Sequence, residues 1–148
     1  MRAGRAHRGL ALACLGAVLG ALFLAGCGGD GDAEQDVQSA VERYFVALSE
    51  RDFATACELV TPSFRNALVA YAERAYPELG SDECVAIARR AARAGGERLV
   101  AAQNQVRVRE VDVDGSEATA GLGPGQLATL ERIEGDWLIE TLDFSGAR

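Results

Sequence analysis

The sequence contains no lysine, and its one histidine, His7, lies close to the N-terminus. The chain after residue 26 therefore has neither an imidazole nor a side-chain amine. This absence excludes histidine-dependent catalytic triads, histidine ligands for metals and lysine Schiff bases from that part of the chain. Carboxylates and tyrosines are the groups left for general acid–base chemistry, and we expect no metal site and no cofactor.

Positive charge is also scarce. The chain has 22 acidic residues, all of them after residue 26, and three of its 15 arginines precede that point, which leaves a formal net charge of about −10 after residue 26. Nucleic-acid binding needs clustered positive charge, so we expect no nucleic-acid partner. An anionic lipid surface would repel the same part of the chain.

The N-terminus has the layout of a secretory signal, with arginines at the start, an apolar run over residues 10–25 and small residues after it. Residues 24–27, with the sequence LAGC, resemble the bacterial lipoprotein box, in which a peptidase cuts before a cysteine whose sulfur carries diacylglycerol. The resemblance implies a lipoprotein signal peptide over residues 1–26 and a lipid anchor on Cys27.

An uncleaved membrane helix is the alternative, because the uncharged run over residues 9–29 is long enough to cross a bilayer. The N-terminal arginines would stay inside, so either arrangement places the rest of the chain on the extracytoplasmic face of the cell membrane. Residues 27–35, rich in glycine and aspartate, are expected to form a flexible spacer. Residues 36–146 have the length of one folded domain.

Two cysteines, Cys57 and Cys84, remain after the signal and the lipidation site are set aside. Thiols in an oxidising compartment pair by default, so we predict a disulfide between them. Two buried free thiols are the alternative, and a metal site with two cysteines and no histidine is less favoured still.

Helical periodicity governs the first half of this domain. Apolar residues recur every three or four positions over residues 37–48, which predicts an amphipathic helix. A break at Asp52 separates it from a short helix over residues 53–60. Thr61 followed by proline is typical of a helix start and predicts a third helix to residue 75. A fourth follows Ser81 and is expected to end at Gly95-Gly96.

The periodicity then becomes alternating, which predicts β-strands. Four are expected, over residues 106–113, 116–122, 126–133 and 137–144, with a bulge in the first where the alternation changes phase. Asp114-Gly115 is typical of a hairpin turn. Helices followed by an antiparallel four-stranded sheet predict an α+β domain.

Two stretches resemble NTF2-like domains of actinobacterial lipoproteins: VQSAVERYFVALSERDFATACELVTPSF at 37–64 and LERIEGDWLIETL at 130–142. The resemblance implies a cystatin-like α+β cone, in which N-terminal helices pack on a curved antiparallel four-stranded sheet and often enclose a pocket. We expect such a pocket to hold a small apolar ligand against five aromatic residues: Tyr44, Phe45, Phe64, Tyr71 and Trp137.

The same superfamily contains isomerase-type enzymes that pair a carboxylate base with a tyrosine donor. Here such a pair would come from Tyr44, Tyr71 or Tyr76 with Asp52, Glu58 or Glu140. No spacing singles out any of these residues, and the tyrosines lie on helix faces that must pack in any case. No catalytic residue is assigned.

Three functions therefore remain open. The favoured one is a non-catalytic, membrane-anchored domain that binds a small apolar ligand in its cone. The second is a scaffold that docks on another envelope protein, with the lipid raising its local concentration. The third is an enzyme that uses only carboxylate and tyrosine. A closed apolar cavity would favour the first, and an exposed patch the second.

Overall fold

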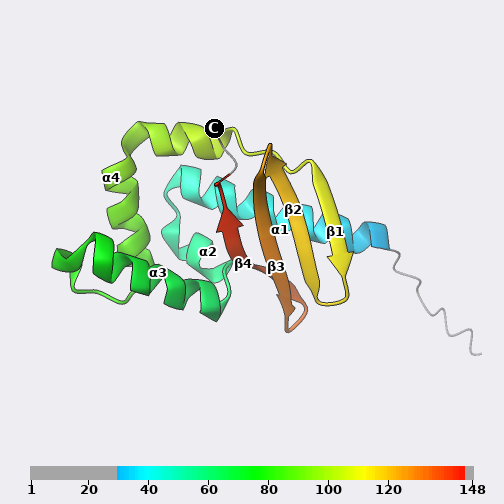
Figure 1. The fold of residues 1–148 in the computed structure, drawn as a ribbon, viewed down its shortest axis with the longest axis horizontal. Coiled ribbons are helices and arrows are strands. Elements are labelled where there is room, and N and C mark those ends of the chain that lie inside the picture. Colours follow the sequence, from blue (N-terminus) through cyan, green and yellow to red (C-terminus); the bar gives the residue numbers. More distant parts are fainter. Residues whose placement is uncertain (1–29, 146–148) are drawn as a thin grey trace, which may run out of the picture.

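The computed structural model describes residues 30–145, apart from the side chains of residues 30 and 96–104. The expected signal segment 1–26 and the expected lipidation site Cys27 lie outside these residues. Helices precede strands along the chain, which confirms the predicted α+β class (Figure 1). The elements are α1 (Asp30–Glu50), α2 (Phe53–Glu58), α3 (Pro62–Ala75), the 3-10 helix η1 (Pro77–Leu79), α4 (Cys84–Asn104), β1 (Glu110–Asp114), β2 (Glu117–Gly123), β3 (Gln126–Ile133) and β4 (Asp136–Asp143).

The four strands form one open, curved sheet in the order β1-β2-β3-β4, and every neighbouring pair is antiparallel. Gly115 in the β1–β2 turn has a φ of 63°, and Glu134 and Gly135 in the β3–β4 turn have φ values of 54° and 100°. These left-handed conformations fit two-residue hairpin loops. The register shifts between Gly121 and Gly123 and between Thr129 and Leu130, and such bulges bend and twist a strand.

Helix α1 covers one face of the sheet, and the main core lies between them (Figure 1). Three alanines, Ala118, Ala120 and Ala128, point inward from the central strands and are at most 5 % exposed. Small side chains here let the helix approach the sheet closely. The buried residues of this main core are Val37, Ala40, Val41, Tyr44, Phe45, Ala47, Ala56, Leu59, Val60, Ala118, Ala120, Leu122, Ala128, Leu130, Trp137 and Ile139.

The segment between α2 and α3 completes the β4 edge of the sheet. Ile139 N donates to Leu59 O at 2.9 Å, and Thr61 N donates to Ile139 O at 2.9 Å, so Val60 pairs with Ile139 in parallel. Pairing satisfies backbone groups that an exposed edge would leave open. The hydroxyl of Thr61 also accepts a hydrogen bond from Phe64 N at 3.1 Å, which confirms the predicted start of α3.

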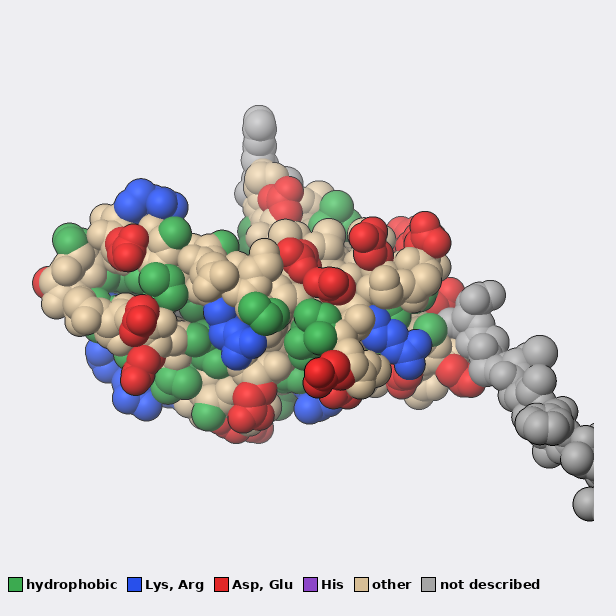
Figure 2. All heavy atoms as spheres, turned by 90° about the horizontal axis from the view of Figure 1, so that it is seen from below, with side chains coloured by type: hydrophobic (Ala, Val, Ile, Leu, Met, Phe, Trp, Pro, Cys, Tyr) green, Lys and Arg blue, Asp and Glu red, His purple; other side chains and the backbone are tan. Residues whose placement is uncertain are grey.

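The opposite face of the sheet carries no helix in the described part of the chain (Figure 1). Strand residues that alternate with the buried ones point outward on this side. In Figure 2 acidic side chains gather toward the upper right, over the end of the sheet where the hairpin turns lie. We call the outward-facing positions of the four strands the open face.

Three expected boundaries are wrong. Helix α1 begins at Asp30, so residues 30–35 are helical and do not belong to a flexible spacer. Acidic residues such as Asp32, Glu34 and Asp36 favour the positive N-terminal end of a helix. Helix α4 continues through Gly95-Gly96 to Asn104 and bends sharply along its length. A glycine pair permits such a bend, and the good helix formers after it extend the helix.

The third wrong boundary is the start of the first strand. Strand β1 begins at Glu110, and residues 106–109 approach it as irregular backbone in place of the expected bulge. Val106 and Val108 nevertheless pack against the main core, as do Val111 and Val113. The change of phase in the alternation therefore marks the junction between the irregular segment and the strand.

Candidate functional site

The five aromatic residues expected to line a pocket do not surround a common space. Tyr44, Phe45 and Trp137 are 8 %, 6 % and 5 % exposed and belong to the main core, and Phe64 packs against it, partly buried. Tyr71 lies elsewhere: it is 49 % exposed and meets Tyr76 edge to face, with ring centroids 6.1 Å apart. The expected place of Tyr71 is therefore wrong.

Side chains fill the space where the pocket was expected. Tyr44 and Phe45 pack edge to face with ring centroids 5.3 Å apart, and the inward alanines of the sheet let α1 lie close to it. Phe45 lines a groove at the surface and Trp137 lines a shallow depression beside the start of β4, whereas Tyr44, Phe64 and Tyr71 line neither. The aromatic residues of α1 thus act mainly as core.

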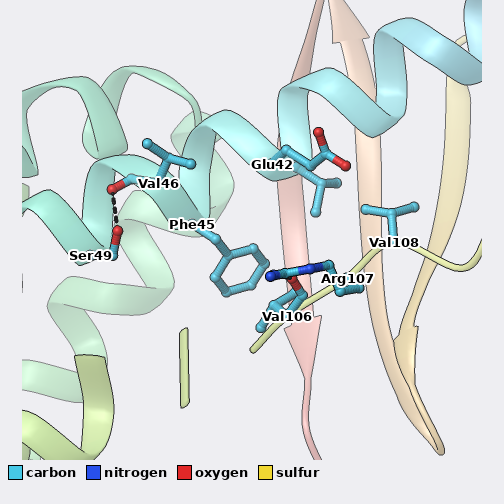
Figure 3. Close-up of a pocket in the computed structure, with 8 residues that line it drawn as sticks. Glu42, Phe45, Val46, Ser49, Val106, Arg107 and Val108 are labelled. Atoms are coloured by element: carbon cyan, nitrogen blue, oxygen red, sulfur yellow. Dashed lines mark hydrogen bonds between the residues drawn. The ribbon is translucent and has the colours of Figure 1, made fainter. Parts of the chain in front are cut away.

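A groove remains beside Phe45, between α1 and the irregular segment before β1 (Figure 3). We call it the Phe45 groove; its volume is about 390 Å³. Val46, 52 % exposed, lies at its rim. The side chain of Arg107 folds back and donates from Nη1 to the carbonyl of the preceding residue, Val106, at 2.7 Å. The groove is lined by Val41, Glu42, Phe45, Val46, Ser49, Val106, Arg107 and Val108.

The residues considered for acid–base chemistry have other roles. Burial raises the pKa of Tyr44 to about 12, which keeps its phenol protonated. Asp52 accepts hydrogen bonds from the hydroxyl of Thr55 at 2.7 Å and from its backbone N at 3.2 Å. These bonds lower the pKa of Asp52, the reverse of what a neutral-pH base requires. Asp52 is the N-cap of α2, as its place at the helix break indicated.

Tyr76 belongs to a surface cluster at the junction of α3, η1 and α4. The guanidinium carbon of Arg90 lies 4.7 Å from the centre of the Tyr76 ring, and Arg90 Nη2 lies 3.2 Å from Glu78 Oε1. Loss of hydration, followed by the charge of Tyr71, raises the pKa of Tyr76. These contacts hold η1 against α4.

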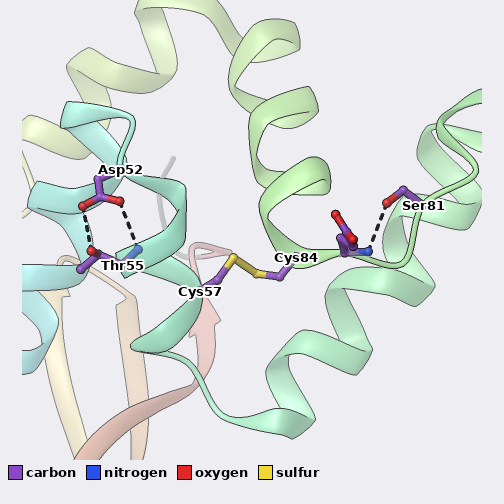
Figure 4. The surroundings of a disulfide bond; sticks show 6 residues. Asp52, Thr55, Cys57, Ser81 and Cys84 are labelled. Atoms are coloured by element: carbon purple, nitrogen blue, oxygen red, sulfur yellow. Dashed lines mark hydrogen bonds between the residues drawn. A yellow bond between two sulfur atoms is a disulfide. The ribbon is translucent and has the colours of Figure 1, made fainter.

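The predicted disulfide between Cys57 and Cys84 is confirmed, with the two Cα atoms 6.1 Å apart (Figure 4). It joins α2 to the first residue of α4. Among the side chains that the structure describes, none from α3 or from residues 84–95 of α4 is a buried member of the main core. In α3 and in the part of α4 whose side chains the structure describes (84–95), the buried apolar residues are Ala72, Ile87 and Ala92, two of them small, and the disulfide adds a covalent link to this packing.

The open face of the sheet holds a second depression, of about 550 Å³. It is lined mainly by carboxylates and hydroxyls and by no arginine. Strands β1, β2, β3 and β4 all contribute to it. Its lining residues are Asp112, Asp114, Glu117, Ala118, Thr119, Thr129, Leu130, Glu131 and Glu140.

Like charges face one another directly across this depression. Asp114 pairs with Glu117 in the register of β1 and β2, and Glu117 pairs with Glu131 in that of β2 and β3. Carboxylates directly opposite on neighbouring strands repel and destabilise a sheet. Beside them, the hydroxyls of Thr129 and Thr141 are 2.7 Å apart and hydrogen-bonded.

Our reading of the sequence missed this acidic surface, although a signal for it exists. In the stretch EVDVD at 110–114, acidic residues alternate with valines, and the valines pack toward the core. A strand with that alternation must present its acids on the other side. To predict that these acids lie beside Glu117 and Glu131, the register of the strands must also be known, and sequence spacing does not give it.

Within residues 30–145, no three histidine, cysteine, aspartate or glutamate side chains gather in a way that could hold a metal ion. None of the helices in the same range combines the length and the apolar character that crossing a bilayer requires.

Comparison of the chain with protein-family models, with curated proteins and with solved structures returns no match.

Proposed function

We propose that this chain is a lipoprotein anchored through Cys27 on the extracytoplasmic face of the cell membrane, and that its NTF2-like domain docks on another envelope protein without catalysing a reaction. The filled core carries this choice over a ligand held inside the cone. The aromatic residues suited to an internal pocket pack in the main core: Tyr44, Phe45 and Trp137. What the domain offers a partner is its surface.

The anchor fits this role. A domain held by a lipid diffuses in the same membrane plane as its partners, which raises its effective concentration. A weak contact is then enough for binding. The negative charge of the region after residue 26 supports a protein partner over nucleic acid or an anionic bilayer.

Site-specific photo-crosslinking in the native host tests the docking proposal. A photoreactive residue is placed at one exposed position on each of four surfaces: Thr119 on the open face, Val46 at the Phe45 groove, Asn66 on α3 and Glu78 on η1. We expect one surface to give a discrete crosslinked product that weakens when Cys27→Ser removes the anchor. Diffuse products of equal intensity from all four positions would contradict docking.

A small apolar ligand remains a second candidate because the Phe45 groove is open and largely apolar. Native mass spectrometry of protein extracted from its own cells tests it. A bound mass that disappears on delipidation, and that Val46→Glu at the rim also removes, would favour this candidate. Val69→Glu on α3, away from the groove, is the matched control.

A further inference from the structure

We propose that the open face of the sheet is the docking surface, and that its partner is a protein presenting clustered arginine or lysine side chains. This inference rests on the proposed docking function and specifies its location and the chemistry of the partner. It follows from the register of the strands, from the sign of the charge on the face and from the absence of a helix over it among residues 30–145.

The charge on the open face has one sign. By alternation with the buried positions, acidic residues point outward from all four strands, and no arginine does so. Arg132, the one arginine within the strands, lies on the inner side, with its guanidinium carbon 5.8 Å from the centre of the Trp137 ring. The acidic residues at outward positions are Glu110, Asp112, Asp114, Glu117, Glu131, Asp136 and Asp143, and Glu140, at the bulge of β4, lines the depression on the same face.

A solvated sheet face needs polar residues, but it does not need one sign of charge. Here Glu117 faces Asp114 on one side and Glu131 on the other, and this arrangement opposes folding. Cations from a partner would convert the repulsion into charge-assisted hydrogen bonds. The sign of the charge therefore points to a basic partner.

The spacing favours a protein surface over a metal ion. The carboxylates are distributed over strands about 4.8 Å apart, and no three of them converge on a point that could hold a metal within the described residues. Separate cationic side chains of one partner match that distribution. Between the acids, Thr119 and Thr129 supply hydroxyls, and Leu127, 49 % exposed, adds apolar contact at the flank.

The test uses a synthetic peptide of alternating arginine and threonine as the probe. Mature protein in nonionic detergent is titrated with the peptide while backbone amide shifts are recorded by NMR. The face variant carries Asp114→Asn, Glu117→Gln and Glu131→Gln. We expect wild-type shifts to concentrate on β1, β2 and β3, and the variant to bind about tenfold more weakly, equivalent to ~1.4 kcal/mol.

The matched control variant removes the same charge from exposed positions on α1 and α3, with Glu34→Gln, Glu50→Gln and Glu73→Gln. It should bind the peptide within about twofold of wild type. Equal weakening in both variants would overturn the proposal, because net charge alone would then attract the peptide. The face variant should unfold at the same or a higher denaturant concentration, which separates lost binding from lost folding.

The crosslinking experiment distinguishes this inference from the function on which it rests. A discrete product from Asn66, Glu78 or Val46, with none from Thr119, would leave docking in place and overturn the open face as its location. No discrete product from any position would overturn both.

Discussion

Removing the disulfide should weaken the helical end of the molecule far more than the sheet. Cys57 and Cys84 are 27 residues apart, and closing a loop of that length is worth about 3.5 kcal/mol on the chain-entropy model. At ~4 °C per kcal/mol for a domain of this size, Cys57→Ala with Cys84→Ala should lower the melting temperature by roughly 14 °C. Alkylation without reductant should leave both wild-type thiols unmodified in exported protein.

Hydrogen exchange shows where the stability is lost. Because the buried apolar residues described in α3 and in residues 84–95 of α4 are Ala72, Ile87 and Ala92, the amides of these two segments should exchange much faster in the double variant. Amides of β2 and β3 should lose less protection than those of α3 and α4, since the main core does not include the bridge. Uniform acceleration across the domain, or a melting temperature within about 3 °C of wild type, would refute this account.

Three further predictions follow from single residues. Cys27→Ser should release the protein from membranes after an alkaline wash, because diacylglycerol supplies two acyl chains at about 0.8 kcal/mol per buried methylene; retention with an uncleaved mass would favour the membrane-helix alternative. Trp137 Nε1 is buried without a hydrogen-bond partner, so Trp137→Phe should cost well under half of the ~3–5 kcal/mol expected for Trp137→Ala in urea unfolding; equal costs would mean that Nε1 has a partner. Asp52→Ala should remove the cap of α2. Because hydrogen bonds from Thr55 lower the pKa of Asp52 below its usual 3.8, the stability that the cap contributes is present above that pH and is lost as the pH falls through the folded-state pKa. The free energies of unfolding of wild type and variant should therefore converge in acid, and a constant difference down to pH 2 would contradict the capping role.

The sequence predicted the elements that depend on local chemistry. The three- and four-residue spacing from Val37 to Leu48 marks the buried side of α1, and the turn residues place β3 within its observed bounds. Gly95-Gly96 misled because a local stop signal was overridden by the helix formers that follow it. Local rules also missed residues 30–35, where the helix extends beyond its buried part.

The candidate site was harder to predict, for a physical reason. Spacing shows that Tyr44 and Phe45 point toward the sheet, but not whether a gap remains there. That depends on how closely α1 approaches the sheet. The small side chains of Ala120 and Ala128, which are far from α1 in the sequence, set this distance. Likewise, the acidic surface exists only once the register sets Glu117 against Glu131.

The early start of α1 bears on how far the domain can reach. If Cys27 carries the lipid, the three residues to Asp30 span at most about 10 Å of extended chain. Helix α1 itself, 21 residues at 1.5 Å each, is roughly 31 Å long, and from Val37 onward it is packed into the domain, so only its first turns add to the reach. The lipid would therefore be a short tether between the domain and the membrane. The domain could sweep along the plane of the membrane but could not extend far from it, so its partners should be proteins of the same bilayer or proteins that come down to it.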